Sequence, residues 1–471
     1  MQVVAEPKDT ADTERPTPGL QENDLFGLDI SVLKWQNFQR HGPASTSENV
    51  AEIAAVASRI VTKDPAYAAA HGLRVSYFTA NAVLGTLAFE LHERLRNSGA
   101  SGDTASVTSI AGFGNVGGLG IDGTVASRLI LEALMCFEQD LEAITAGEYK
   151  HPWDAATLSH RQYTPQFAMR QTSRFISEAV GTLGRRSRGD PADIGVWMSA
   201  ADGLYPDYYL NNYHYQTDGW LSQRSANVYE TSTETLFVGR QDAMQRSTLR
   251  PLLASGVASA NGGKPRILEV ACGTGRFATF VRDNLPSCEM TAVDLSPFYL
   301  DAARENDAYW GKTRAGTGFG VTSKPAPIKL TQANAETLPF EDGSFDAVVC
   351  VYLFHELPSE ARANAAREMA RVVAPGGTVV LTDSMQKGDR PALDEQLSRF
   401  SNLNEPHYNG YIETHLGELF CEDAGLVRGS KIVASSSKTL SFRKPELTPS
   451  AEGSDMTAKD EEEDTYPEEA L

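Results

Sequence analysis

Long apolar runs, paired cysteines and an excess of positive charge are all missing from this sequence. No apolar stretch reaches the roughly 20 residues that a membrane-spanning helix needs, and the acidic N-terminus has neither a hydrophobic core nor an arginine-rich amphipathic pattern. We therefore expect a soluble, cytoplasmic protein that does not integrate into a membrane.

The cysteine pattern and the net charge indicate the cellular compartment and exclude some classes of binding partner. Cys136, Cys272, Cys288, Cys350 and Cys421 are scattered without a C-x-x-C pair, which is typical of a reducing compartment. The formal net charge of −20 at pH 7 argues against binding to nucleic-acid phosphates. No cluster has the spacing of a zinc site, and no G-x-S-x-G or Ser-His-Asp arrangement suggests hydrolysis. We expect neither a nucleic-acid partner nor a metal.

The chain is too long, at 471 residues, for one typical hydrophobic core. Composition and periodicity predict five consecutive segments. These are a disordered segment (1–29), a mostly α-helical domain (30–203), an aromatic lid or linker (204–240), an α/β domain (241–445) and an acidic disordered tail (446–471).

Helical spacing of apolar residues dominates residues 30–203. The expected helices cover 50–61, 66–96, 124–144 and 165–183, the second with a break near Asn81. Their apolar faces have three interpretations, which the sequence leaves open. They form a core packed on the α/β domain, a homodimer interface, or a hydrophobic tunnel for a substrate.

A glycine turn between a strand and a helix lies at the centre of the α/β segment. Residues 266–277 read RILEVACGTGRF, so a branched apolar run breaks at Gly273 and Gly275 before a helical pattern begins. Such a turn lets a ligand approach the backbone and the first N–H groups of the helix. Asp294 ends the next predicted strand at the offset of about 20 residues expected of a ribose-binding carboxylate. A NAD-dependent oxidoreductase uses the same pattern and stays an alternative.

Five sequence blocks follow one another within residues 241–444. They read E-x-A-C-G-T-G, V-D-L-S, A-E-T-L-P-F-E-D-G-S-F-D, L-F-H-E-L-P and R-V-V-A-P-G-G. In this order they resemble the class I S-adenosylmethionine-dependent methyltransferases, nearest to the type 11 group of ubiquinone and menaquinone C-methyltransferases. The resemblance implies a Rossmann-like, seven-stranded α/β domain. Two positions depart from the pattern: Ala271 replaces the first glycine, and Asn334 replaces an aspartate, although an amide oxygen can still accept a hydrogen bond.

The resemblance also implies S-adenosyl-L-methionine as cofactor and assigns eight residues to it. The methionine end would be held by Glu269, Gly273 and Gly275, and the ribose hydroxyls would bind to Asp294. The adenine would contact Leu295, Asn334 and Ala335, and Val351 would line the path to the sulfur. From the residues alone, each glycine also fits an ordinary tight turn, and Asp294 also fits an N-cap of the helix that follows.

The groups that would act on the acceptor are less constrained. Methyl transfer is an in-line displacement, so the protein mainly aligns the reactants and excludes water. His355 follows the fourth strand of the α/β domain, and His214 and Asp218 lie in the aromatic segment 204–240. Each is a candidate base, and His355 also fits a structural role. The aromatic segment is either a pocket lid or a seam between domains.

We therefore predict an S-adenosylmethionine-dependent methyltransferase that acts on a small or lipophilic organic acceptor, with the acceptor atom undetermined. The helical domain would help to form the acceptor pocket. A non-catalytic scaffold that keeps the cofactor fold is the third interpretation. Intact Glu269, Gly273, Gly275 and Asp294 argue against a scaffold, because it would not need them.

Overall fold

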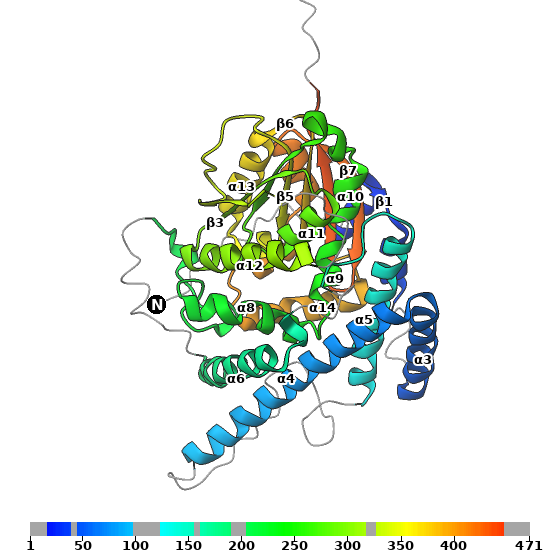
Figure 1. The fold of residues 1–471 in the computed structure, drawn as a ribbon, viewed down its shortest axis with the longest axis vertical. Helices are drawn as coiled ribbons and strands as arrows, with labels where there is room; N and C mark the ends of the chain where they lie inside the picture. The colour runs from blue at the N-terminus through cyan, green and yellow to red at the C-terminus, as the bar shows by residue number, and fades with distance from the viewer. Residues whose placement is uncertain are drawn as a thin grey trace, which may run out of the picture.

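The chain folds around one mixed β-sheet in the computed structural model (Figure 1). The structure describes residues 17–38, 45–97, 123–154, 161–189, 204–316 and 326–446. Residues 1–16 and 447–471, for which disorder is expected, lie outside the described residues.

Eight strands form the sheet in the order β1-β7-β8-β6-β5-β2-β3-β4. Strands β2 to β6 pair in parallel, and β8 runs antiparallel to both of its neighbours, β6 and β7. The strands are β1 (Gly27–Leu28), β2 (Arg266–Val270), β3 (Glu289–Asp294), β4 (Lys329–Gln332), β5 (Phe345–Val351), β6 (Val373–Ser384), β7 (Val427–Ala434) and β8 (Ser437–Arg443). Seven of them, β2 to β8, confirm the expected Rossmann-like sheet.

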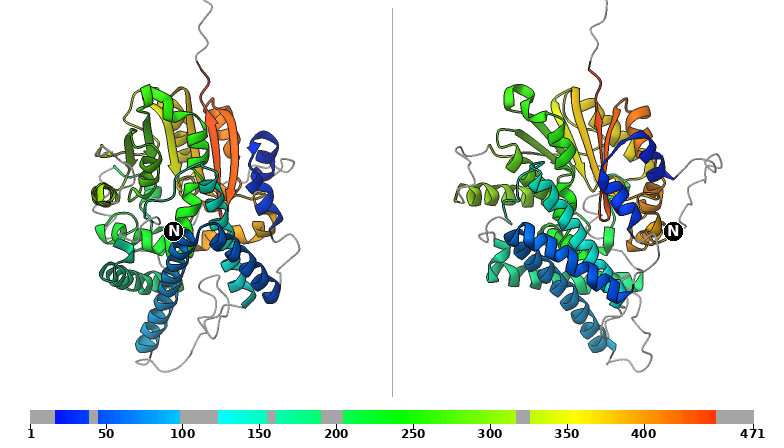
Figure 2. Two further views of the ribbon diagram at one scale, coloured as in Figure 1. Left: turned by 45° about the vertical axis from the view of Figure 1, so that its right-hand side comes forward. Right: turned by 90° about the vertical axis from the view of Figure 1, so that its right-hand side faces the viewer.

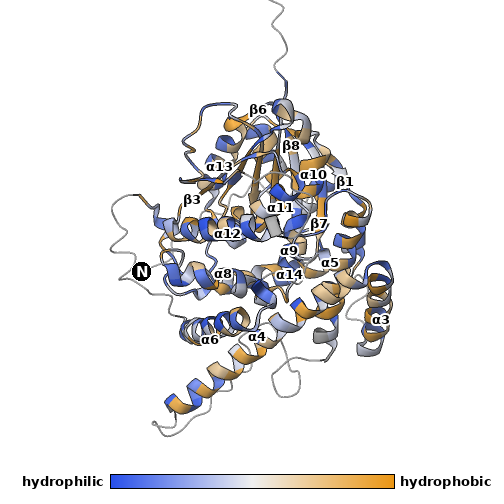
Figure 3. Ribbon diagram, in the orientation of Figure 1, coloured by the Kyte–Doolittle hydropathy of each residue, from blue (hydrophilic) through white to orange (hydrophobic). Residues whose placement is uncertain are grey.

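The central strands consist largely of branched apolar residues that are buried on both faces, as parallel strands covered by helices require. Figure 3 shows apolar residues along the strands of this sheet and also along helices such as α4. The helices next to it are α10 (Leu249–Ala254), α11 (Arg276–Asn284), α12 (Pro297–Gly316), α13 (Ser359–Val372), α15 (Tyr408–Ile412) and α16 (Leu416–Glu418).

The eighth strand belongs to a segment for which the sequence predicts disorder. Within the described residues 17–29, Pro18–Leu25 forms α1 and the chain continues into β1 beside β7. Glu22 of α1 lies 2.6 Å from Nζ of Lys438 and 3.3 Å from Nζ of Lys431. Both lysines are buried, and a buried ammonium group needs a counter-charge. The expectation of disorder is therefore wrong for these residues, which lie beside the terminal strands (Figure 2).

The four helices expected in residues 30–203 are present. They are α3 (Thr46–Lys63), α4 (Pro65–Asn97), α5 (Gly123–Thr145) and α6 (Pro165–Arg188), preceded by α2 (Ile30–Asn37). The expected break near Asn81 is wrong, because α4 continues through it. Oδ1 of buried Asn81 accepts a hydrogen bond from Thr172 of α6 across 2.8 Å, so its amide oxygen is satisfied within a continuous helix.

Two helices connect these elements to the sheet: α8 (Gln223–Leu236) and α9 (Gln241–Arg246). Figure 1 shows α4, α6 and α8 gathered at one end of the sheet, with the far end of α4 extending beyond the rest of the protein. Among the described helices, even α4 and α5 lack an apolar stretch that could traverse a bilayer.

Candidate active site

The glycine turn lies between the end of β2 and the start of α11. Its path requires left-handed backbone at Ala271 (φ +57°), Gly273 (φ +54°) and Gly275 (φ +75°). A Cβ atom at Gly275 would also lie 3.1 Å from Cβ of Ala303 in α12. Glycine is therefore needed at Gly275 for both conformation and space. Ala271 adopts the same conformation with a side chain, which is strained.

Asp294 ends β3 and faces this turn. Its Oδ2 accepts a hydrogen bond from the backbone N–H of Gly273 (2.9 Å), and its Oδ1 accepts one from Ser296 (2.8 Å). Burial raises the pKa of Asp294 to about 6. The helix that follows is capped by Ser296, whose Oγ accepts from the N–H of Tyr299 at 3.2 Å. The N-cap of this helix is therefore Ser296 and not Asp294.

Glu269 is the most deeply buried acid beside the turn. It is 2% exposed, and Oε2 has no hydrogen-bond partner among the described residues. Burial, with the nearby charge of Asp294, raises the pKa of Glu269 to about 8. An orphaned carboxyl oxygen next to a glycine turn fits the ammonium end of an amino-acid-bearing cofactor, because such a group would supply the missing donor.

One cavity of about 490 Å³ brings most of the assigned residues together. Glu269, Gly273, Asp294, Leu295, Asn334, Ala335 and Val351 all line it. Gly275 is not part of the lining and instead packs on α12. Oδ1 of Asn334 accepts a hydrogen bond from the backbone N–H of Glu336 at 3.0 Å, so this amide is already oriented by a local turn.

The structure separates the three candidate bases. His214 and His355 line the cavity, whereas Asp218 does not. Burial lowers the pKa of His214, which keeps its imidazole neutral. Asp218 has left-handed backbone (φ +63°), and its carbonyl accepts from the N–H of Leu221 at 3.0 Å. This position does not favour Asp218 as a base.

His355 lies between two carboxylates. Nδ1 is 2.6 Å from Oδ1 of Asp383, and Nε2 is 3.4 Å from Oε1 of Glu356. These negative charges raise the pKa of His355 well above its usual value despite the opposing effect of burial. A base works best with a pKa near the working pH, so this environment favours a positively charged, structural His355.

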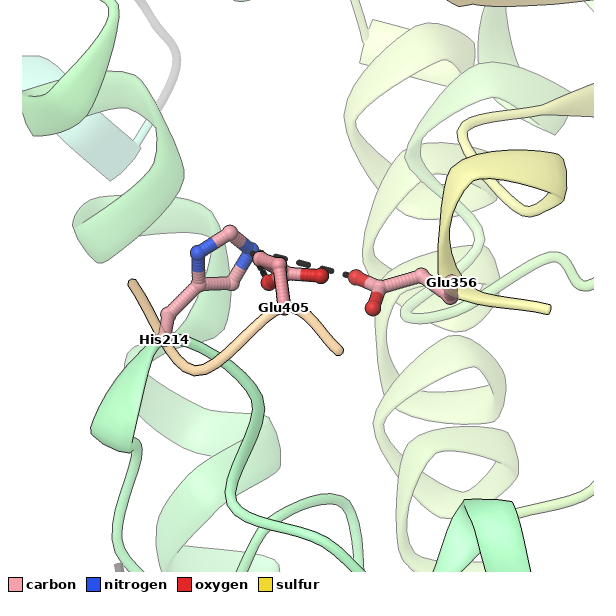
Figure 4. Close-up of side chains that lie close together, drawn as sticks. All are labelled: His214, Glu356 and Glu405. Atoms are coloured by element: carbon pink, nitrogen blue, oxygen red, sulfur yellow. Dashed lines mark ion pairs between the residues drawn. The ribbon is translucent and has the colours of Figure 1, made fainter. Parts of the chain in front are cut away.

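Two acidic residues, Glu356 and Glu405, are buried and lie next to His214 (Figure 4). The L-F-H-E-L-P block already places Glu356 beside His355 after the fourth strand of the α/β domain. Glu405 has no local motif, because only the folded chain brings it to this position.

The aromatic segment 204–240 contributes Tyr208, Tyr209 and Trp220 to the lining of the cavity. The ring of Trp220 stacks on Tyr213 with centroids 4.5 Å apart and lies 5.1 Å from Tyr209. Tyr208 donates a hydrogen bond to Glu336 at 2.7 Å, which connects the segment to the α/β part. Arg185 of α6 donates to the carbonyl of Tyr215, also at 2.7 Å. The segment therefore lines the cavity and also joins α6 to the sheet.

Comparison with known proteins identifies the same region. A family described as "Methyltransferase domain" matches residues 267–377. Demethylmenaquinone methyltransferase of Deinococcus radiodurans is 36% identical over 118 residues, which cover 25% of this chain and 42% of the relative. Phosphatidylethanolamine N-methyltransferase of Cereibacter sphaeroides is 33% identical over 158 residues, which cover 33% of this chain and 68% of the relative.

A further relative is the ubiquinone/menaquinone biosynthesis C-methyltransferase of Pasteurella multocida. It is 30% identical over 200 residues, which cover 42% of this chain and 63% of the relative. The chain spans about half the length of the first curated relatives it matches. None of the relatives named here is a nicotinamide-dependent oxidoreductase.

The matched region contains the glycine turn, Glu269, Asp294 and Asn334, and the orphaned Glu269 fits the cofactor of these enzymes, S-adenosylmethionine. The relative from Cereibacter sphaeroides is matched over more than two thirds of its length. The chain belongs to the class I S-adenosylmethionine-dependent methyltransferases.

Proposed function

We propose that this protein transfers the methyl group of S-adenosylmethionine to a small, lipophilic organic acceptor. One observation carries the proposal: the cavity with the cofactor-assigned residues continues along an apolar wall. That wall includes Phe175 and Leu183 of α6, together with Trp220 and Phe400. A single concave space that is lined largely by apolar side chains can hold two molecules in contact.

The residues of the cofactor side have separate tasks. When bound, the cofactor supplies a sulfonium methyl group. Asp294, already oriented by Gly273, would accept hydrogen bonds from the ribose hydroxyls in its ionised form. Glu269 would accept from the ammonium group, and the backbone of the glycine turn would approach the carboxylate. Leu295 and Ala335 would contact the adenine.

The helical region contributes residues to the acceptor side of the cavity. Ala82, Gly85 and Thr86 of α4 and Phe175 of α6 all line the cavity, so we assign residues 30–203 to the acceptor pocket and 204–240 to its lid. The quinone methyltransferases among the relatives support an acceptor with a large apolar surface. Gly85 of α4 packs closely on the ring of Phe175, because a Cβ atom there would lie 3.0 Å from that ring, so α4 and α6 together form this apolar part of the pocket.

A reducing compartment such as the cytoplasm is part of the same proposal. All five cysteines are free thiols, and four of them are buried. Because none of them forms a disulfide, the fold does not depend on an oxidising environment, which suits a compartment that keeps cysteines reduced.

The test is methyl transfer by the purified full-length chain with S-adenosylmethionine labelled in its methyl group. We expect label in one class of a panel of demethylmenaquinols, phenols, amines and thiols, and release of S-adenosylhomocysteine. Calorimetric titration with S-adenosylhomocysteine and NAD separates the alternatives. Binding of NAD alone, or of neither compound, would contradict the proposal, and an Asp294→Ala variant should abolish the labelling.

A further inference from the structure

Three side chains from separate segments lie close together (Figure 4), and two of them, His214 and Glu356, line the cavity. His214 lies in a short 3-10 turn (Tyr213–Tyr215), Glu356 in another (Phe354–Glu356), and Glu405 shortly after a third (Ser398–Leu403). One ligand-capable atom of each lies within 4.8 Å of the others. Nε2 of His214 is 3.0 Å from Oε1 of Glu405 and 3.8 Å from Oε1 of Glu356.

The carboxyl groups of this cluster are buried without enough donors. Glu405 is completely buried, and neither of its oxygens accepts a hydrogen bond of regular geometry from the described residues; its polar neighbours include Nε2 of His214, 3.0 Å from Oε1, and the carboxyl group of Glu356. Glu356 is also buried, and its Oε2 accepts no hydrogen bond from the described residues. Burial of carboxyl oxygens without partners is costly. These oxygens therefore indicate a group that belongs between them.

The donor set favours a metal ion over an organic ligand. One imidazole nitrogen and two carboxylates are ligands that divalent transition metals prefer. We propose that His214, Glu356 and Glu405 bind a single divalent transition-metal ion, Zn²⁺ or Mn²⁺, in the wall of the acceptor cavity. His214 and Glu356 line that cavity, so an ion held by them would lie next to the space that the proposed function assigns to the acceptor.

The backbone around the cluster is held in place by the protein itself. Nδ2 of Asn404 donates to the carbonyl of Asn212 (2.7 Å) and to Oδ1 of Asn211 (3.0 Å). These bonds connect the segment before His214 to the segment before Glu405. His214 (φ +55°) and Asn404 (φ +63°) both have left-handed backbone. Metal sites need ligands that are fixed in this way before the ion arrives.

A shared proton is the competing explanation. A proton between Glu356 and Glu405 would satisfy two of the same oxygens, and Nε2 of His355 lies 3.4 Å from Oε1 of Glu356. The two explanations differ in a measurable way. A metal site loses its ion when Glu405 becomes glutamine, whereas a protonated Glu405 is closely mimicked by glutamine.

The experiment uses the full-length chain, treated with a chelator and then titrated with Zn²⁺ or Mn²⁺ alone by calorimetry. We expect one ion per chain, an increase in melting temperature on metal addition, and broadening of the Mn²⁺ electron paramagnetic resonance signal. Glu405→Gln should weaken binding at least tenfold. Glu305→Gln, at an exposed position of α12, is the matched control and should bind like the wild type.

His214→Asn gives a second, independent variant. Asparagine tolerates left-handed backbone, so this variant should fold and also lose the ion. Absence of binding by the wild type at millimolar metal would overturn the proposal in favour of the shared proton. Equal binding by wild type, Glu405→Gln and His214→Asn would overturn it as well. Methyl transfer is not part of the measurement, so its outcome is independent of the proposed function.

Discussion

The backbone N–H of Gly273 donates a hydrogen bond to Oδ2 of Asp294 across 2.9 Å, which ties the end of β3 to the turn after β2. The other oxygen, Oδ1, accepts from the N–H of Ser296. The plane of the carboxylate is therefore fixed before a ligand binds. Each oxygen keeps a further lone pair for a hydroxyl group.

Replacement of this carboxylate should weaken cofactor binding. We expect Asp294→Ala to reduce the affinity for S-adenosylhomocysteine more than tenfold, about 1.4 kcal/mol, because two hydroxyl groups lose their acceptor. Calorimetric titration measures the effect, and Asp301→Ala on the exposed side of α12 serves as control. The affinity of wild type should also fall as the pH drops below about 6, where Asp294 becomes protonated. Unchanged affinity in a folded Asp294→Ala variant would refute this assignment.

Glu269 should make the stability of the ligand-free protein depend on pH. Its pKa is about 8 in the folded state against 4.5 as the ordinary value. Between these values the folded chain holds a proton that the unfolded chain has released, so the free energy of unfolding decreases as pH rises. The slope contributed by this group is about 1.4 kcal/mol per pH unit.

Glu269→Gln removes this proton uptake. We expect the variant to have a shallower pH dependence of chemical unfolding between pH 5 and pH 8 than wild type, as bounded by the two pKa values. Glu289→Gln, exposed at the start of β3, should follow the wild-type curve. Parallel curves for wild type and Glu269→Gln would show that Glu269 is ionised in the folded protein.

Alanine at the first glycine position of the motif should cost stability. Ala271 has a φ of +57°, a conformation that costs an L-residue roughly 1–2 kcal/mol. Glycine relieves this strain but loses more entropy on folding, by roughly 0.4–1 kcal/mol. We expect Ala271→Gly to raise the free energy of unfolding by about 1 kcal/mol or less, measured by urea unfolding. A decrease would mean that the methyl group of Ala271 makes packing contacts that outweigh the strain.

Gly275 should tolerate no side chain. Gly275→Ala adds a Cβ atom 3.1 Å from Cβ of Ala303, at a position with a φ of +75°. Gly256 has a similar φ of +80°, but a Cβ atom added there would have no heavy atom within 4 Å. We expect Gly275→Ala to destabilise the fold by more than Gly256→Ala, which alone costs roughly 1–2 kcal/mol. Equal losses of stability would show that α12 moves away without cost.

Sequence alone could predict the features that depend on local backbone. The turn with Gly273 and Gly275 needs residues that adopt left-handed conformations, and Asp294 must end the next strand to reach that turn. Such requirements leave a readable pattern over a few dozen residues. The family and the Rossmann-like sheet were implied by the resemblance of five such blocks, taken in order, to the class I methyltransferases.

Only the tertiary structure decided which groups meet across the cavity. Asp383 of β6 raises the pKa of His355, which lies in the turn after β5, and Glu405 reaches His214 from a segment far along the chain. Asn81 lies within a continuous helix, where its amide oxygen accepts from Thr172 of another helix. Glu22 of the N-terminal segment pairs with two distant buried lysines that also contact Asp389. The physical reason is the same in each case: burial and charge pairing are set by neighbours in space, which short-range sequence patterns do not specify.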